Sequence, residues 1–192
     1  EAKSIDDLQT LLARVGRQIV FSLDSTASRA EHSLTHDKPR FAFFQVFQPR
    51  GGGKRQAPTF DVIAPGVAKH EEEIVLAPGA EPAADPNLVL RVAVAAAEFG
   101  LPIAPGTLRN LKKCPIGDRN WTDESRELFI RLLASGPALL NVWEDIDFID
   151  VPGKLIPEWL GVRNRPSASA AHRYTIDRHM VEVVTRLGRE TP

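Results

Sequence analysis

The stretch DPNLVLRVAVAAAEFG, residues 85–100, decides the fold class that the sequence predicts. Asp85 and Pro86 are typical of a helix start, with aspartate as the N-cap and proline at the first helical position. Gly100 is the expected end of this helix. Apolar residues between them recur at helical spacing and are expected to form the buried face: Leu88, Val89, Val92, Ala95, Ala96 and Phe99.

Further helices are predicted on the C-terminal side of this stretch. A short helix is expected from about Pro105 to Lys113, a second is capped by Thr122 and ends at Gly136, and a third starts at Pro137. The last two carry apolar residues at helical spacing: Leu128, Phe129, Leu132, Leu133, Leu139, Leu140, Trp143 and Ile146. A run of four or more helices joined by short loops is typical of an α bundle.

The N-terminal side begins with a long amphipathic helix. Ser4 is the expected N-cap and Asp7 stands at the N3 position, from which the helix is predicted to run to about His32. Its apolar residues recur at steps of three and four: Ile5, Leu8, Leu11, Leu12, Val15, Ile19 and Leu23.

Between the long helix and the bundle, the pattern changes to that of a loop and short strands. A phenylalanine-rich burst within residues 41–47 is followed by Gly51–Gly53, which we interpret as a flexible loop tip. Strands are expected at residues 60–63, 66–69 and 73–76, separated by turns. The predicted fold is therefore mainly α, a helical bundle with a small inserted antiparallel β element.

Composition excludes several classes of protein. The 192 residues carry a formal net charge of -1, so the chain lacks the general positive field that attracts nucleic acid. No apolar run approaches the length of a membrane span. The single cysteine, Cys114, cannot form an internal disulfide, and we interpret it as an unreactive thiol in a reducing, cytoplasmic compartment. Position 1 is glutamate, which fits a piece of a longer protein.

The segment that contains the candidate functional residues lies near the C-terminus. Pro157 and Pro166 interrupt regular helix in an irregular connection, within which Trp159 is expected to be buried. Thr175 is then expected to cap a final helix, with Asp177 in its first turn. Its predicted apolar face consists of Ile176, Met180, Val183, Val184 and Leu187.

On this final helix, His179 is expected to project from the core side or close to its edge, because it lies three residues after Ile176 and four before Val183. A histidine that points inward needs a hydrogen bond or a metal. Spacing alone leaves both interpretations open.

Two motifs carry a resemblance to a known family. LIPEWLGVRNRP, residues 155–166, followed by HRYTIDRH, residues 172–179, resembles the start of the HD domain in bifunctional PII uridylyltransferases/uridylyl-removing enzymes, most closely their actinobacterial branch. Earlier segments resemble the family's helical domain and linking region. The family motif YTVDxH stands here as Tyr174–His179, with isoleucine in place of valine.

The resemblance implies a function for the parent protein. Such enzymes transfer a nucleotide from UTP, or ATP in actinobacterial members, to the PII signal-transduction protein of nitrogen regulation. A separate HD phosphohydrolase domain, which uses a divalent metal such as Mg²⁺ or Mn²⁺, removes it. His179 matches the first metal-binding histidine of that domain. The other HD ligands and the nucleotidyltransferase core are not in this sequence, so the chain alone is expected to be inactive.

The resemblance also implies a division of the chain. Residues 1–38 correspond to the end of the helical domain that follows the nucleotidyltransferase core, and residues 39–84 to a loop and small β element. Residues 85–165 correspond to a helical linking bundle and residues 166–192 to the start of a truncated HD domain.

Two other hypotheses come from different classes. The chain could be a stand-alone helical scaffold or interaction module without chemistry. It could also be a small metal-dependent phosphohydrolase built on His172, His179 and Glu182, with Asp177 as a further ligand. Against the second hypothesis, Glu182 has the helical spacing to pair with Arg178 or Arg186 instead.

Overall fold

The computed structural model describes residues 4–36, 59–116, 121–167 and 174–190. Its helices are α1 (Ile5–His36), α2 (Leu88–Phe99), α3 (Pro105–Leu111), α4 (Asp123–Leu133), α5 (Leu139–Phe148), α6 (Val151–Leu155) and α7 (Ile176–Glu190). The 3-10 turns are η1 (Pro82–Ala84), η2 (Gly136–Ala138) and η3 (Pro157–Gly161). The strands are β1 (Asp61–Ala64), β2 (Val67–His70) and β3 (Glu73–Leu76). The predicted fold class, mainly α with a small antiparallel β element, is confirmed.

Helix α2 forms the centre of the core. It packs against α4 and α5 on one side and against β2 and β3 on the other, so it is buried almost all round. The predicted face is correct for its first five members, but Leu90, Ala93 and Val94 are buried as well, and Phe99 is 48% exposed. The helix ends at Gly100, whose φ of 64° is left-handed, as expected.

The start of α2 differs from the prediction. The helix begins at Leu88, two residues after Pro86, because the Asp85 carboxylate forms a turn instead of an N-cap. Asp85 Oδ1 accepts from the Asn87 amide at 3.0 Å, and both of its oxygens accept from Arg91 Nη2 at 2.7 Å. The Asp85 carboxylate therefore stabilises the turn that precedes α2 and does not cap the first turn of the helix.

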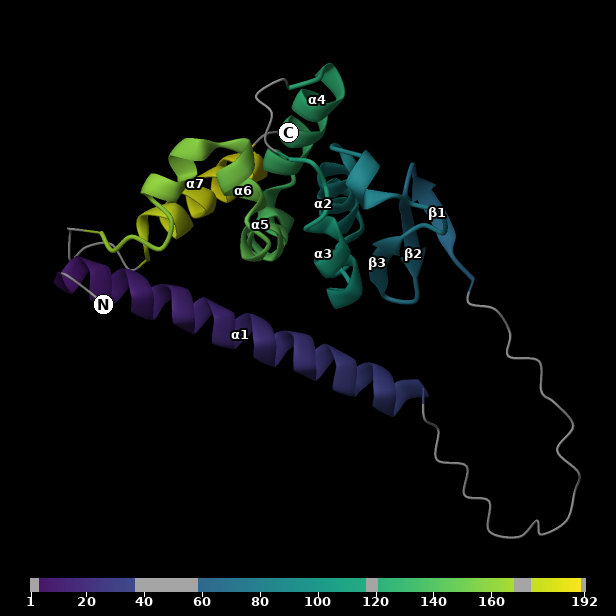
Figure 1. Ribbon diagram of the computed structural model, residues 1–192, viewed down its shortest axis with the longest axis horizontal. Coiled ribbons are helices and arrows are strands. Elements are labelled where there is room, and N and C mark those ends of the chain that lie inside the picture. The colour runs from purple at the N-terminus through teal and green to yellow at the C-terminus, as the bar shows by residue number, and fades with distance from the viewer. Residues whose placement is uncertain (1–3, 37–58, 117–120, 168–173, 191–192) are drawn as a thin grey trace, which may run out of the picture.

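The three strands lie within one residue of their predicted positions. They form an antiparallel sheet in the order β1-β2-β3, with Val67 opposite Leu76 and Lys69 opposite Ile74. The Ile74 amide donates to the Pro102 carbonyl and the Ala104 amide donates to the Ile74 carbonyl, which ties β3 to the connection between α2 and α3. The sheet thus closes one end of the helical core (Figure 1).

Helix α1 is confirmed, and it extends to His36. Ser4 caps it as predicted, since its Oγ accepts from the Asp7 amide at 3.1 Å. The helix lies along one side of the bundle (Figure 1), with the Phe21 ring stacked on that of Phe148 at 3.7 Å. Its apolar stripe faces away from the bundle, and every member is at least 40% exposed: Ile5, Leu8, Leu11, Leu12, Val15, Ile19 and Leu23.

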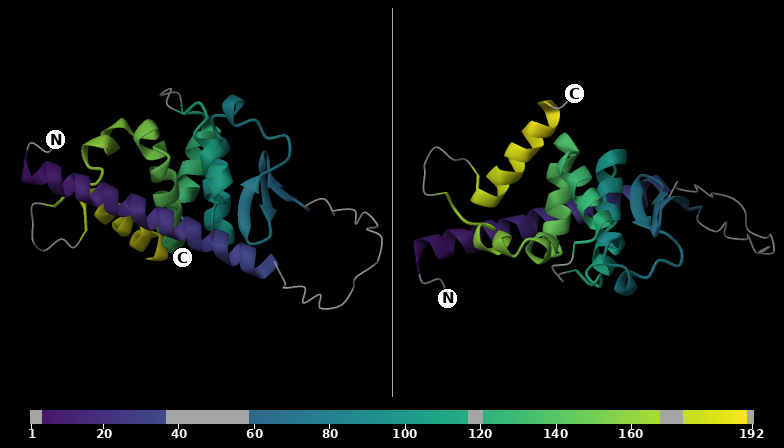
Figure 2. Two further views of the ribbon diagram at one scale, coloured as in Figure 1. Left: turned by 60° about the horizontal axis from the view of Figure 1, so that its bottom comes forward. Right: turned by 90° about the horizontal axis from the view of Figure 1, so that it is seen from above.

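Helix α7 lies on the side of the bundle away from the sheet (Figure 2) and packs on η2 and α5. Its predicted apolar face is only partly correct: Ile176 and Val184 are half-buried and Val184 packs against the core, but Met180, Val183 and Leu187 are 48%, 43% and 60% exposed. The buried face consists instead of Asp177, Val181 and Thr185. At its far end, a Cβ placed on Gly188 would lie 3.1 Å from Gly136 Cα, so close backbone contact holds this face inward.

The irregular connection before α7 agrees with the prediction. Trp159 is 6% exposed, and its ring meets that of Trp143 at 5.2 Å in an edge-on arrangement. The predicted phenylalanine-rich burst, the Gly51–Gly53 loop tip and His172 lie outside the described residues.

Candidate functional site

Asp177 is the most deeply buried ionisable group at the base of α7. Its side chain is 0% exposed, although a carboxylate is rarely placed in a protein interior without a partner. Its Oδ2 accepts from the Asn164 amide at 2.8 Å and from Arg17 Nη1 at 2.9 Å. Arg17 also donates from Nη2 to Thr175 Oγ1 at 3.1 Å. One arginine of α1 therefore holds the first turn of α7.

Asn164 makes the backbone bond to Asp177 possible. Its φ of 59° is left-handed, a conformation that asparagine adopts more readily than most residues. The residue is 6% exposed, so this turn lies inside the protein rather than at its surface. The turn aims a backbone N–H at the Asp177 carboxylate, and it lies within the VRNRP motif that precedes α7.

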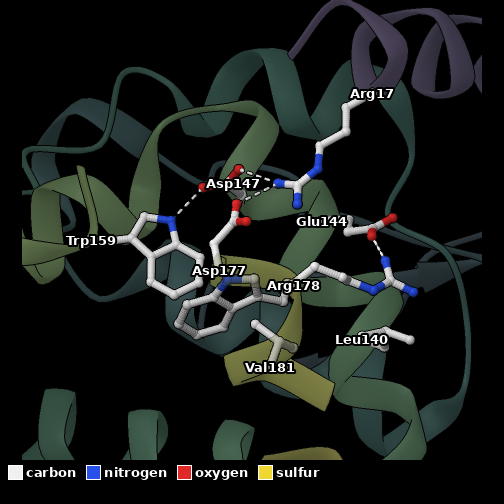
Figure 3. Close-up of a pocket in the computed structure, with 9 residues that line it drawn as sticks. Arg17, Leu140, Glu144, Asp147, Trp159, Asp177, Arg178 and Val181 are labelled. Atoms are coloured by element: carbon white, nitrogen blue, oxygen red, sulfur yellow. Dashed lines mark hydrogen bonds and ion pairs between the residues drawn. The ribbon is translucent and has the colours of Figure 1, made fainter. Parts of the chain in front are cut away.

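Asp147 of α5 forms the second half of the same network. Its Oδ1 accepts from Trp159 Nε1 at 2.8 Å, and its Oδ2 accepts from Arg163 Nε at 3.0 Å. Arg17 Nη1 also lies 3.7 Å from Asp147 Oδ2, so a single guanidinium faces both buried aspartates (Figure 3). Helices α1, α5 and α7 and the η3 connection are thereby joined through ionic and hydrogen-bonded contacts.

The charges of this network are set by burial and by its arginines. Burial raises the pKa of Asp147, and the Trp159 hydrogen bond and the Arg163 and Arg17 charges lower it in part. Burial lowers the pKa of Arg163, but its bonds to Asp150 and Asp147 outweigh this and raise it overall. Arg163 therefore stays protonated, and its Nη1 donates to Asp150 Oδ1 at 2.6 Å. Carboxylates that are held in this way are suited to positioning helices rather than to proton transfer.

His179 lies on the exposed side of α7, so the expectation that it projects from the core side is wrong. The reason is rotational: α7 buries Asp177, two residues earlier, and successive residues on a helix are about 100° apart. Asp177 and His179 therefore point in different directions and do not converge on one ligand.

The other proposed hydrolase ligands do not complete a site with His179. Glu182 Oε1 lies 3.5 Å from Arg178 Nε, as the spacing predicted, and Arg178 also forms an ion pair with Glu144 (Figure 3). Within the described parts of the chain, no group of three histidine, cysteine, aspartate or glutamate side chains has the arrangement of a metal site. The small-hydrolase hypothesis therefore has no geometric support among these residues.

Cys114 does not extend the chemistry of this region. It is 4% exposed, and burial raises the pKa of its thiol to about 11. A thiol with such a pKa is almost entirely protonated at neutral pH and is a poor nucleophile. The interpretation of Cys114 as an unreactive residue is confirmed.

A groove of about 1010 Å³ separates α1 from the bundle. Its charged lining is mixed, with Arg14, Lys112 and Arg178 beside Asp24 and Asp145. Burial and, as a smaller cause, the charge of Asp24 across the groove together raise the pKa of Asp145 to about 7. The groove therefore holds one carboxyl that changes its charge near neutral pH.

Four residues of this region were not identified from the sequence: Arg17, Asp147, Arg163 and Asn164. Arg163 and Asn164 lie within the VRNRP motif, residues 162–166, so the motif had already indicated the segment that contains them. Arg17 and Asp147 have no local sequence signal, because Arg17 contacts Asp177 160 residues away, and Asp147 contacts Trp159 and Arg163 12 and 16 residues away.

None of the helices in the described parts of the chain combines the length and apolar character that a membrane span requires. No protein-family model matches the chain. No solved structure matches it significantly.

Three curated proteins are similar to most of the chain or to a large part of it. The bifunctional uridylyltransferase/uridylyl-removing enzyme of Streptomyces coelicolor is 35% identical over 185 residues, which are 94% of this chain and 22% of that protein. The enzyme of the same name from Mycobacterium tuberculosis is 35% identical over 177 residues, 92% of this chain and 20% of that protein. The Corynebacterium glutamicum enzyme is 34% identical over 107 residues, 56% of this chain and 16% of that protein.

The chain thus spans about a fifth of the length of the first two relatives. Over nearly all of its own length, it is similar to one segment of actinobacterial bifunctional uridylyltransferase/uridylyl-removing enzymes, and this confirms the resemblance that the sequence motifs indicated.

Proposed function

We propose that this chain, similar over nearly all of its length to one segment of bifunctional uridylyltransferase/uridylyl-removing enzymes, is a helical connector within such an enzyme and is inactive alone. The observation that carries the proposal is the 35% identity over 94% of the chain. The activity of the whole protein would be nucleotide transfer to PII from UTP or ATP, and hydrolytic removal of that nucleotide. This would place it in the cytoplasm and in nitrogen regulation.

The arrangement of the network supports a connector. Arg17 of α1 contacts Asp177 of α7 and lies beside Asp147 of α5, so one side chain relates the first and last described helices to the bundle. A connector between two catalytic domains needs such fixed relations, because the relative positions of its ends set the positions of the domains attached to them.

Two exposed apolar surfaces support the same proposal. The stripe of α1 faces away from the bundle, and Met180, Val183 and Leu187 of α7 are also exposed. Soluble proteins rarely leave long apolar stripes uncovered, and such stripes mark contact surfaces. In the proposed enzyme, the α1 stripe would pack against the helical domain that follows the nucleotidyltransferase core. The α7 stripe would pack against the remainder of the HD domain.

In the proposed enzyme, His179 would be the first ligand of a divalent metal, Mg²⁺ or Mn²⁺. The described residues do not fit such a site by themselves. Both ions prefer oxygen ligands, and the two nearest carboxylates in sequence, Asp177 and Glu182, are held by Arg17 and Arg178. The proposal therefore requires carboxylate ligands from the part of the enzyme that would follow α7.

A stand-alone scaffold would bind its partners through the same exposed apolar stripes and would catalyse no reaction. An assay therefore has to distinguish the connector from the scaffold. We expect the 192-residue chain to be folded and to neither modify PII with UTP or ATP nor release nucleotide from modified PII. Turnover of either kind by this chain, retained after repurification, would overturn the connector proposal. A connector and a scaffold are distinguished when the chain replaces the similar segment of a relative, because only a connector would support the activities of the domains around it.

A further inference from the structure

A small cavity lies beneath the Arg17–Asp177 ion pair, and Figure 3 shows the residues around it. Its volume is about 10 Å³. Side chains of α1, α5, η3 and α7 line it, among them Trp143, Asp177, Arg178 and Val181. A cavity of this volume admits one water molecule and nothing larger.

Three polar atoms of the lining residues are buried and have no hydrogen-bond partner among the described residues: Trp143 Nε1, Asp177 Oδ1 and Arg178 Nε. The 3.5 Å separation between Arg178 Nε and Glu182 Oε1 is an ion-pair contact without the geometry of a hydrogen bond. Two other atoms share this buried, unpartnered state, Asn164 Oδ1 and Thr185 Oγ1, and their residues do not line the cavity. Most of the unpartnered buried polar atoms therefore belong to residues around one cavity.

The chemistry of these three atoms selects the occupant. Trp143 Nε1 and Arg178 Nε can only donate a hydrogen bond, and Asp177 Oδ1 can only accept one while the carboxyl is ionised. A cation would satisfy Asp177 but would face two N–H donors. An anion would satisfy the donors but would face a carboxylate. A water molecule can accept from both donors and donate to the oxygen, which gives it about three hydrogen bonds, the usual number for a buried water.

We propose that one long-lived water molecule occupies this cavity, accepts hydrogen bonds from Trp143 Nε1 and Arg178 Nε, and donates one to Asp177 Oδ1. The water bridges α5 and α7, since Trp143 belongs to α5 and the other two residues to α7. It completes the hydrogen bonding of Asp177, whose other oxygen is already held by Arg17 and the Asn164 amide. The histidine-bearing helix is then fixed to the bundle through a solvent molecule as well as through its ion pair.

The three tryptophans provide the test in one NMR sample. Trp159 also lines the cavity, but its Nε1 already donates to Asp147 at 2.8 Å, while Trp121 lies outside the lining and is partly exposed. Substitutions W121F and W143F assign the indole N–H signals. We expect the Trp143 indole proton to show NOE and ROE cross-peaks of opposite sign to the water resonance, the signature of a long-lived bound water. The Trp159 indole proton, which is bonded to Asp147, should show a weaker cross-peak than that of Trp143. If Trp143 shows no such cross-peak while its N–H is protected from exchange, the cavity is dry and the proposal is overturned.

A cavity-filling variant gives a second readout. Val181→Ile adds one methylene to the lining, and filling a dry apolar void would raise the thermal unfolding midpoint. A filled cavity that expels a water leaves three polar atoms unpartnered, so we expect the midpoint to fall and the Trp143–water cross-peak to disappear together. A raised midpoint with an unchanged Trp143 spectrum would contradict the proposal.

Discussion

Arg17 and Asp177 are 160 residues apart in the sequence, and Arg17 Nη1 lies 2.9 Å from Asp177 Oδ2. The aspartate is fully buried and the arginine side chain is 31% exposed, so the arginine closes the carboxylate off from solvent. Together with the Phe21–Phe148 ring contact, this pair fixes α1, whose apolar stripe faces outward, to the bundle. It also orients α7 so that Asp177 points inward and His179 outward.

Replacing Arg17 with methionine should destabilise the chain by about 2 kcal/mol, because Asp177 would remain buried with the Asn164 amide as its one protein donor among the described residues. Urea unfolding measures the change. Arg14→Met, one turn earlier on the exposed surface of α1, is the control and should change stability by less than about 0.5 kcal/mol. Equal effects of the two variants would show that the ion pair does not stabilise the fold.

Stability should depend on pH through Asp145. Its pKa is about 7 in the folded chain, against an ordinary value of 3.8, so the folded state binds more protons between these values. The free energy of unfolding should therefore fall as pH rises through this window and should level off above pH 7. Between pH 5 and pH 8, the loss should be on the order of 2 kcal/mol. Urea unfolding at both pH values measures it.

Asp145→Asn should remove most of this pH dependence and should be more stable than the natural chain at pH 8. Asp24→Asn should remove a smaller part, since the charge of Asp24 is the second cause of the shift after burial. A natural chain that is equally stable at pH 5 and pH 8 would contradict the assigned burial of Asp145.

Two glycines in helices should respond oppositely to alanine. A Cβ on Gly188 would lie 3.1 Å from both Cα and N of Gly136, and a backbone contact of this kind relaxes poorly. Gly188→Ala should therefore destabilise the chain by about 1 kcal/mol, with overpacking outweighing the better helix propensity of alanine. A Cβ on Gly16 of α1 would have no neighbouring atom within 4 Å, so Gly16→Ala should stabilise the chain by about 0.5 kcal/mol. Thermal unfolding of both variants measures the difference, and stabilisation by both would contradict the close packing of α7 on η2.

The sequence predicted most elements because their signals are local. The caps at Ser4 and Thr122, the left-handed Gly100 and the turns between the three strands all act within a few residues. The orientation of α1 and α7 was not predictable in this way. An apolar stripe indicates a buried face, but α1 and α7 turn their stripes outward because Arg17 and Asp177 meet across the fold.

The candidate site was predictable only in part, for the same reason. The motif around Tyr174–His179 identified the segment through its resemblance, and Asp177 was placed correctly in the first turn of α7. Its partner Arg17 lies in a different helix, and nothing near Arg17 in the sequence indicates an ionic role. The exposed position of His179 follows from that pairing and could not be read from helical spacing.

The central claim is that this chain is the connector of a bifunctional enzyme and that His179 serves nucleotide removal. The direct test is a chimera of the Streptomyces coelicolor relative in which the segment similar to this chain is replaced by these 192 residues. Uridylyl transfer to PII and uridylyl removal are measured separately, for the chimera and for its His179→Ala and Arg186→Ala variants. Arg186, exposed on α7, provides the matched control.

We expect the chimera and its Arg186→Ala variant to perform both reactions, and we expect His179→Ala to lose removal by about 100-fold or more while transfer is retained, as for loss of a metal ligand. Unchanged removal by His179→Ala would contradict the assigned role of His179. A folded chimera that performs neither reaction would contradict the connector itself.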